Sequence, residues 1–184
     1  MSSRRRAMRR ILVIAACALT PAVAACSVES TLPPPYCSRS GSALIVAQSV
    51  PTASQIPCFE DLPAGWTFAS VLVNERHTLI TLNSDRVGAG AAVLRYDETC
   101  DTSDAVPAPS DHPAAERYDE ITRLRPGLEA EQYYVFPGGC VWWTFDFDSD
   151  TSATQAVAID DALELVSRAD LNDQVRQTFI DEEI

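Results

Sequence analysis

The sequence predicts an α+β domain: an antiparallel sheet of about five to six strands, two C-terminal helices packed on one face, and two disulfides. Apolar and polar residues alternate through the middle of the chain, polar turns separate these segments, and the apolar spacing becomes helical after residue 152. Four cysteines after residue 36 provide the two bridges. We see no internal repeat and no second domain.

Six segments rich in β-branched and aromatic residues are predicted strands. They cover residues 66–74, 77–83, 90–96, 118–124, 132–136 and 140–148. The last two flank Pro137-Gly138-Gly139 and predict a hairpin, because glycine readily takes the positive φ of tight turns. Residues 101–113 contain three prolines and are predicted to form a loop. The apolar segment 42–49 fits a helix or a strand, and we favour a helix capped by Ser42.

The last predicted strand separates two kinds of side chain by its period of two. The core face receives Val141, Trp143, Phe145 and Phe147, and the other face receives Trp142, Thr144, Asp146 and Asp148. An aromatic residue with polar neighbours is typical of binding surfaces. Trp142 and Thr144 are therefore the candidate binding face, unless a helix or loop covers them.

The C-terminal part changes to a helical period. Ser152 and Gln155 have the spacing of a capping box. One apolar stripe would consist of Ile159, Ala162, Leu163 and Val166, with Asp160, Asp161 and Glu164 facing water. Asp170 is predicted to cap a second helix with apolar positions Leu171, Val175 and Phe179.

The N-terminus predicts export. Five arginines within the first ten residues precede an apolar stretch of about 15 residues, which is shorter than the roughly 20 needed to span a membrane. Val23-Ala24-Ala25-Cys26 then resembles the bacterial lipobox, which implies cleavage before Cys26 and a diacylglycerol on its sulfur. A second match ending at Cys17 would leave an apolar core of only about six residues, so Cys26 is preferred.

The predicted organisation follows from this cleavage point. Residues 1–25 are a lipoprotein signal peptide, residues 26–36 an acylated cysteine with a proline-rich tether, and residues 37–184 a single α+β extracytoplasmic domain. The expected location is the outer face of the cell membrane, held by the lipid anchor.

The mature chain is strongly acidic and contains no lysine. After Cys26, 26 acidic residues face nine arginines, a net charge of −17. This charge argues against nucleic acid, whose binding requires cationic side chains, and favours cations or basic partner surfaces. Solubility alone would also explain it.

The cysteines after Cys26 are Cys37, Cys58, Cys100 and Cys140. An even number in an oxidising compartment predicts two disulfides with three possible connectivities. We favour Cys37–Cys58 and Cys100–Cys140. The absence of a C-x-x-C pair and the presence of only two histidines argue against zinc.

Three further patterns contain residue types used in chemistry, but they predict no catalytic residue and no cofactor. Asp146, Asp148 and Asp150 have the spacing that opens a calcium loop, but Thr151 and Val157 occupy the positions of the required glycine and glutamate. These aspartates remain a weak cation candidate. The Ser110-Asp111-His112 run contains hydrolase residue types, yet adjacency in sequence is no triad. The carboxylates Glu116, Asp119 and Glu120 would pair by chance in so acidic a chain.

Several short motifs together resemble a set of uncharacterised actinobacterial exported proteins over about residues 43 to 170. They are Ser84-Asp85-Arg86, Cys100-Asp101, residues 109–113 with Arg117-Tyr118, and Tyr133-Tyr-Val-Phe-Pro-Gly-Gly-Cys140. This resemblance implies a compartment and brings no activity. The expectation is a non-catalytic binding or accessory lipoprotein for an envelope protein or small ligand. The alternative is an extracytoplasmic enzyme or calcium-dependent module using the acidic loops.

Overall fold

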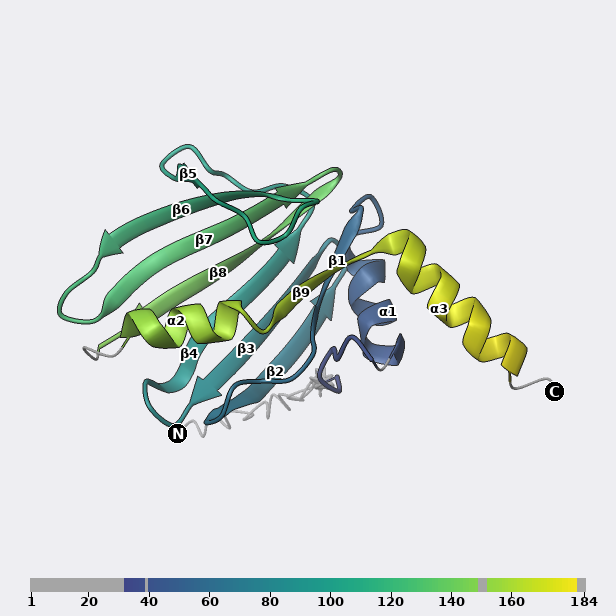
Figure 1. The fold of residues 1–184 in the computed structure, drawn as a ribbon, viewed down its shortest axis with the longest axis horizontal. Helices are drawn as coiled ribbons and strands as arrows, with labels where there is room; N and C mark the ends of the chain where they lie inside the picture. Colours follow the sequence, from purple (N-terminus) through teal and green to yellow (C-terminus); the bar gives the residue numbers. More distant parts are fainter. Residues whose placement is uncertain (1–31, 39, 149–151, 182–184) are drawn as a thin grey trace, which may run out of the picture.

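The computed structural model describes residues 32–38, 40–148 and 152–181. Within these residues the chain forms an α+β domain with two antiparallel sheets and three helices (Figure 1). The predicted fold class is confirmed. Cys26, Asp150 and the predicted signal peptide lie outside the described residues.

The main sheet has seven strands in the order β2-β3-β4-β8-β7-β6-β5. They are β2 (Trp66–Asn74), β3 (His77–Ser84), β4 (Gly88–Asp97), β5 (Val106–Ala108), β6 (Glu116–Arg123), β7 (Leu128–Phe136) and β8 (Gly139–Phe147). The predicted number of five to six is wrong because β5 lies inside the segment predicted as a loop. Pro107 is compatible with β5 because this strand is at the sheet edge, where a missing N–H is tolerated.

A second, two-stranded sheet pairs β1 (Gln55–Phe59) with β9 (Leu163–Ser167). The predicted helical stripe from Ile159 to Val166 is therefore wrong beyond its first residue, since α2 (Ser152–Asp160) ends directly after Ile159 and Asp160. Leu163 pairs with Phe59 and is buried. This pairing with a strand far earlier in the sequence overrides the local helical spacing.

The helices are placed differently from the prediction. The helix α1 (Ser40–Ser49) confirms the helix favoured for this segment, but the predicted cap is wrong because the helix begins two residues before Ser42. The helix α2 and the strand β9 cross in front of the main sheet (Figure 1). A hydrogen bond of 2.9 Å between the hydroxyls of Ser49 and Thr78 ties α1 to the same side. The last helix, α3 (Arg168–Asp181), extends away from this layer beside α1, so only one of the two C-terminal helices covers the sheet (Figure 1).

The cap of α3 is Ser167 rather than Asp170. The Ser167 hydroxyl accepts a hydrogen bond from the Asp170 N–H at 3.0 Å and donates to the Asp170 carboxylate at 2.6 Å, an arrangement like a capping box. Arg168 then donates to the carbonyls of Ala47 and Val50 at 3.0 and 2.8 Å. The carbonyl groups at the C-terminal end of α1 are therefore capped by an arginine from a distant part of the chain.

The face of the main sheet beneath α1, α2 and the two-stranded sheet holds the core, and we call it the covered face. As predicted, the inward residues of β8 are almost fully buried: Val141, Trp143, Phe145 and Phe147. They pack with Phe59 of β1 and Ile159 of α2. The opposite side of the main sheet is called the open face, and none of the three described helices lies over it.

Both predicted disulfides are present, Cys37–Cys58 and Cys100–Cys140. The first lies where the chain enters the domain. Just before it, Tyr36 forms a bridge with Phe59, and the Phe59 N–H donates to the Pro35 carbonyl at 3.0 Å. The described end of the predicted tether thus runs along the domain.

Candidate binding surface

Three aromatic side chains lie in register across the open face. Tyr118 of β6 pairs with Tyr133 of β7, and Tyr133 pairs with Trp142 of β8. The rings of Tyr133 and Trp142 stack at 6.1 Å between centroids and 22° between planes. Tyr118 and Trp142 are half-buried, whereas Tyr133 between them is buried. These three residues are called the aromatic row.

The alternation in β8 placed Trp142 and Thr144 on this side correctly. Thr144 pairs with Glu131, and both lie two residues along their strands from the aromatic row and on the same face. The sequence did not reveal Tyr118 and Tyr133 as neighbours of Trp142, because only the register between β6, β7 and β8 brings them together.

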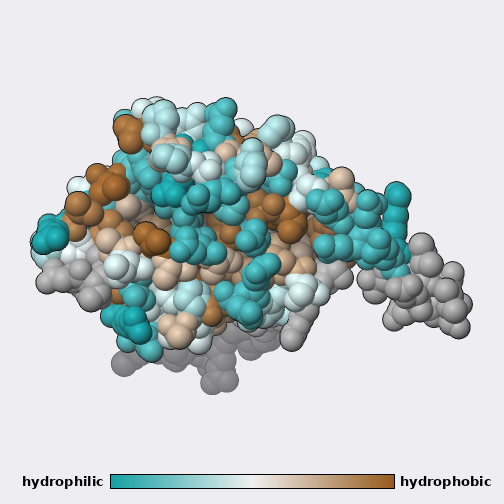
Figure 2. Space-filling view, viewed as in Figure 1, coloured by the Kyte–Doolittle hydropathy of each residue, from teal (hydrophilic) through white to brown (hydrophobic). Residues whose placement is uncertain are grey.

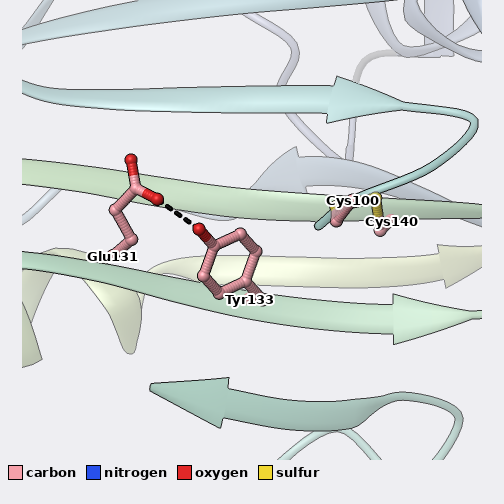
Figure 3. The surroundings of a disulfide bond; sticks show 4 residues. All are labelled: Cys100, Glu131, Tyr133 and Cys140. Atoms are coloured by element: carbon pink, nitrogen blue, oxygen red, sulfur yellow. Dashed lines mark hydrogen bonds between the residues drawn. A yellow bond between two sulfur atoms is a disulfide. The ribbon is translucent and has the colours of Figure 1, made fainter. Parts of the chain in front are cut away.

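Tyr133 is held in place by Glu131 on the same strand. The Tyr133 hydroxyl donates a hydrogen bond to the Glu131 carboxylate (Figure 3). The second Glu131 oxygen accepts from the Thr144 hydroxyl at 3.4 Å. Burial, followed by the influence of the Glu131 carboxylate, raises the pKa of Tyr133 far above its ordinary value. The phenol therefore stays protonated and acts as a donor that orients Glu131.

The Cys100–Cys140 disulfide borders the aromatic row. Cys140 lies two residues before Trp142 and therefore on the same face of β8. Cys100 belongs to the segment that leaves β4, so the bridge ties this segment to the start of β8 (Figure 3). Asp101 is close enough for its charge to contribute to the raised pKa of Tyr133.

Beside the aromatic row the open face is hollowed and acidic. The hollow has a volume of about 360 Å³. Its polar lining comes from β6, the start of β7 and β8: Glu120, Thr122, Glu129, Glu131, Thr144 and Asp146. We call it the acidic hollow. Four carboxylates on three neighbouring strands make it a site of negative potential.

Arg123 neutralises only part of this charge. Its guanidinium lies 2.9 Å from Asp146, 3.5 Å from Glu129 and 3.8 Å from Asp148. Glu120 forms no ion pair within the described part of the chain. The hollow thus keeps a net negative charge around an arginine that is already shared among three carboxylates.

Two of the three aspartates suggested as a cation site form ion pairs with an arginine. Asp146 and Asp148 both contact Arg123, and Asp150 lies outside the described residues. Among the described residues, no group of three or more histidine, cysteine or acidic side chains is arranged to hold a metal ion. The cation site stays a prediction.

A buried polar cluster on the covered face was missed by sequence reasoning. Asp160 ends α2 and was expected to face water, yet it is only 9% exposed. Its carboxylate accepts hydrogen bonds from the Trp143 indole at 2.9 Å and the Tyr134 hydroxyl at 2.8 Å, and Arg117 lies 3.7 Å away. Burial raises the pKa of Asp160, although Gln132 and these donors act in the opposite direction.

One signal for this cluster was present in the sequence. Trp143 and Tyr134 were recognisable as strand residues, and a buried indole or phenol normally needs a hydrogen-bond partner. The partner is a carboxylate on α2, and only the packing of that helix against the sheet identifies it.

The Ser110-Asp111-His112 run lies next to this cluster. The His112 ring meets the Tyr134 ring edge-on, with centroids 4.9 Å apart. The Ser110 hydroxyl donates to the His112 carbonyl at 3.0 Å and accepts from the His112 N–H at 3.2 Å. Ser110 is therefore engaged in a turn and not with the imidazole, so this geometry provides no nucleophile and base. The neighbouring cavity of about 300 Å³ is lined by Asp111, His112, Tyr134, Asp160, Asp161, Leu163 and Glu164.

The carboxylates weighed for glycoside chemistry are divided between the two faces. Asp119 lies on the covered face, where Arg117 donates to it at 2.9 Å. Glu116 and Glu120 lie on the open face, and Glu116 accepts a hydrogen bond from Tyr118 at 2.8 Å. Because a glycosidase needs two carboxylates facing one bond, this arrangement does not support that chemistry.

A small apolar groove runs between α2 and β6. Its volume is about 160 Å³, and its rim includes Ile121, Leu124 and Val157, each more than half exposed. Figure 2 shows apolar surface gathered over this part of the molecule. Three of the five exposed large apolar side chains in the described residues therefore share one groove.

A scan against protein-family models, a search of curated proteins and a search of solved structures each gave no match to this chain. In the described part of the chain, no helix combines the length and apolar character needed to cross a membrane.

Proposed function

We propose that this chain is a lipid-anchored extracytoplasmic envelope lipoprotein that acts as a non-catalytic binding or accessory module through its open face. The observation that carries the proposal is the aromatic row, which lies on a sheet face that the described helices leave uncovered. Tryptophan and tyrosine supply large contact areas at low entropic cost and are frequent hot spots.

The alternative is an extracytoplasmic enzyme that uses the acidic loops. The cavity beside His112 is the observation that favours it. Against it, both oxygens of Asp160 already accept hydrogen bonds from Trp143 and Tyr134, and Ser110 does not contact the imidazole. The binding role therefore needs fewer rearrangements than catalysis.

The anchor is tested by replacing Cys26 with alanine in the native host. We expect the parent protein to carry a diacylglycerol on Cys26 and to partition with membranes, because two acyl chains give stable anchoring. The C26A variant should be released or left unprocessed. Intact mass and membrane fractionation measure both results, and an unacylated soluble parent would contradict the anchor.

The binding face is tested by the Trp142→Ala variant. Loss of a hot-spot tryptophan should weaken partner capture by about 2 kcal/mol, roughly thirtyfold in Kd. Folding should be preserved, because Trp142 lies outside the core. The measurement is crosslinking in native membranes followed by identification of the captured protein.

The matched control is Ile45→Ala, which removes an exposed apolar side chain from α1 on the other side of the molecule. Capture by this variant should equal that of the parent. Equal capture by W142A would remove the open face from the proposal.

A further inference from the structure

We infer that the partner of the open face is a basic polypeptide, whose arginine or lysine side chains enter the acidic hollow and lie over Trp142. This inference rests on the proposed binding role of that face and specifies the chemistry of the partner. Three properties of the face support it: its charge, the free carboxylate in the hollow, and the position of the tryptophan.

The first property is the charge balance. The register of β4, β6, β7 and β8 places six carboxylates on the open face but only two arginines. The carboxylates are Asp97, Glu116, Glu120, Glu129, Glu131 and Asp146, and the arginines are Arg95 and Arg123. A basic partner is steered toward this face, whereas nucleic acid and anionic lipid are repelled.

The second property is an available carboxylate inside the acidic hollow. Glu120 has no ion pair within the described residues, and Glu131 beside it is held by neutral hydroxyl donors from Tyr133 and Thr144. A guanidinium or ammonium group would satisfy both carboxylates with charge-assisted hydrogen bonds. The volume of about 360 Å³ leaves room for such a side chain.

The third property is the aromatic row next to the hollow. Tyr118, Tyr133 and Trp142 each lie two residues along their strands from Glu120, Glu131 and Thr144. Positions two apart in a strand are separated by about 7 Å on one face. A second cation of the same peptide can therefore lie over the Trp142 ring, where the quadrupole attracts it.

The position of Arg95 limits where the partner lies. Arg95 of β4 pairs with Trp142 on the side away from Tyr133, so its positive charge repels a basic partner there. A basic segment is therefore expected over β6, β7 and β8.

The test uses the lipid-anchored protein purified in detergent and titrated by calorimetry. The probes are nona-arginine and nona-lysine peptides, with nona-glutamate and a neutral chitin oligosaccharide as comparisons. Because the whole chain is acidic, any loss of negative charge could weaken the binding of a basic peptide. The decisive comparison is therefore between two variants that each lose two negative charges, one inside the acidic hollow and one away from it. Glu120→Gln with Glu131→Gln removes two charges from the hollow, and Glu60→Gln with Asp61→Asn removes two exposed charges between β1 and β2.

We expect the basic peptides to bind the parent, and the hollow variant and W142A each to weaken binding about tenfold. The E60Q/D61N control should change Kd less than about twofold. Trp142→Phe keeps an aromatic face and should retain most of the affinity, which separates loss of the ring from a folding defect.

Equal weakening by the two charge-matched variants would mean general attraction and would overturn the inference. Binding of the oligosaccharide in place of the basic peptides would overturn it as well. The proposed binding role would survive either outcome if the parent protein, but not W142A, were crosslinked to a neutral or acidic partner in native membranes. If W142A captured the same partners as the parent protein in native membranes, the proposed binding role of the open face would itself be contradicted.

Discussion

Replacing Asp160 with alanine is expected to lower the free energy of unfolding by about 3 to 5 kcal/mol, because breaking a buried ionic cluster leaves its partners unsatisfied. The Trp143 indole and the Tyr134 hydroxyl would each lose an acceptor, and Arg117 would lose one of its two carboxylates. Urea unfolding followed by tryptophan fluorescence measures the change.

Asp161 provides the matched control for this variant. It is adjacent in sequence but exposed. Asp161→Ala should therefore change the unfolding free energy by no more than about 0.5 kcal/mol. Equal effects of D160A and D161A would show that the cluster contributes nothing to stability.

The same carboxyl group predicts a pH dependence of stability. Burial raises the pKa of Asp160 above its ordinary value of 3.8, so the folded state binds this proton more tightly than the unfolded state. Its contribution to stability must therefore fall as pH rises from about 3.8 through the raised pKa, and stay constant above it. Asp160→Asn should remove this component of the curve. A curve that is identical for D160N and the parent would contradict the assignment.

Removing the Cys100–Cys140 disulfide should cost about 4 kcal/mol, the chain-entropy value for a loop of this length. The bridge spans 40 residues and holds the exit of β4 against the start of β8. We expect the Cys100→Ser, Cys140→Ser variant to unfold at a lower urea midpoint. Its Trp142 and Tyr133 rings should become more accessible, because the bridge borders the aromatic row.

The Cys37→Ser, Cys58→Ser variant is the comparison. Its loop of 21 residues predicts a smaller loss of about 3 kcal/mol and no change around Trp142. Intact mass with and without reduction first establishes that each bridge forms in the purified protein. A free thiol at Cys100 or Cys140 in the oxidised parent would contradict the pairing.

Much of the architecture was predictable from local patterns. The alternation of Val141, Trp143, Phe145 and Phe147 identified both the last strand and the buried side of the sheet. Glycines at the turn before it marked the hairpin of β7 and β8. These features are local, because a strand and a tight turn are read from neighbouring residues.

The larger errors concern contacts between distant parts of the chain. Leu163 and Val166 have helical spacing, but they belong to a strand that pairs with β1. The helix α3 was predicted to cover the sheet, but it begins after Ser167 and extends beside α1. Asp160 was predicted to face solvent because its position on the helix was inferred from the spacing of apolar residues alone. A local pattern cannot reveal that a tryptophan and a tyrosine from the sheet need an acceptor at that position.

The sequence by itself determined the class of fold, the location of most strands along the chain and the side of β8 that carries Trp142, and it favoured the two cysteine pairings that the structure contains. It also determined the large acidic excess, which is a property of composition. Only the tertiary structure decided that Tyr118 and Tyr133 join Trp142 in one row, that four carboxylates from three strands share a hollow, and that Asp160 is buried. The physical reason is that these arrangements depend on strand register and helix packing, which bring together residues whose sequence separation carries no signal of their contact.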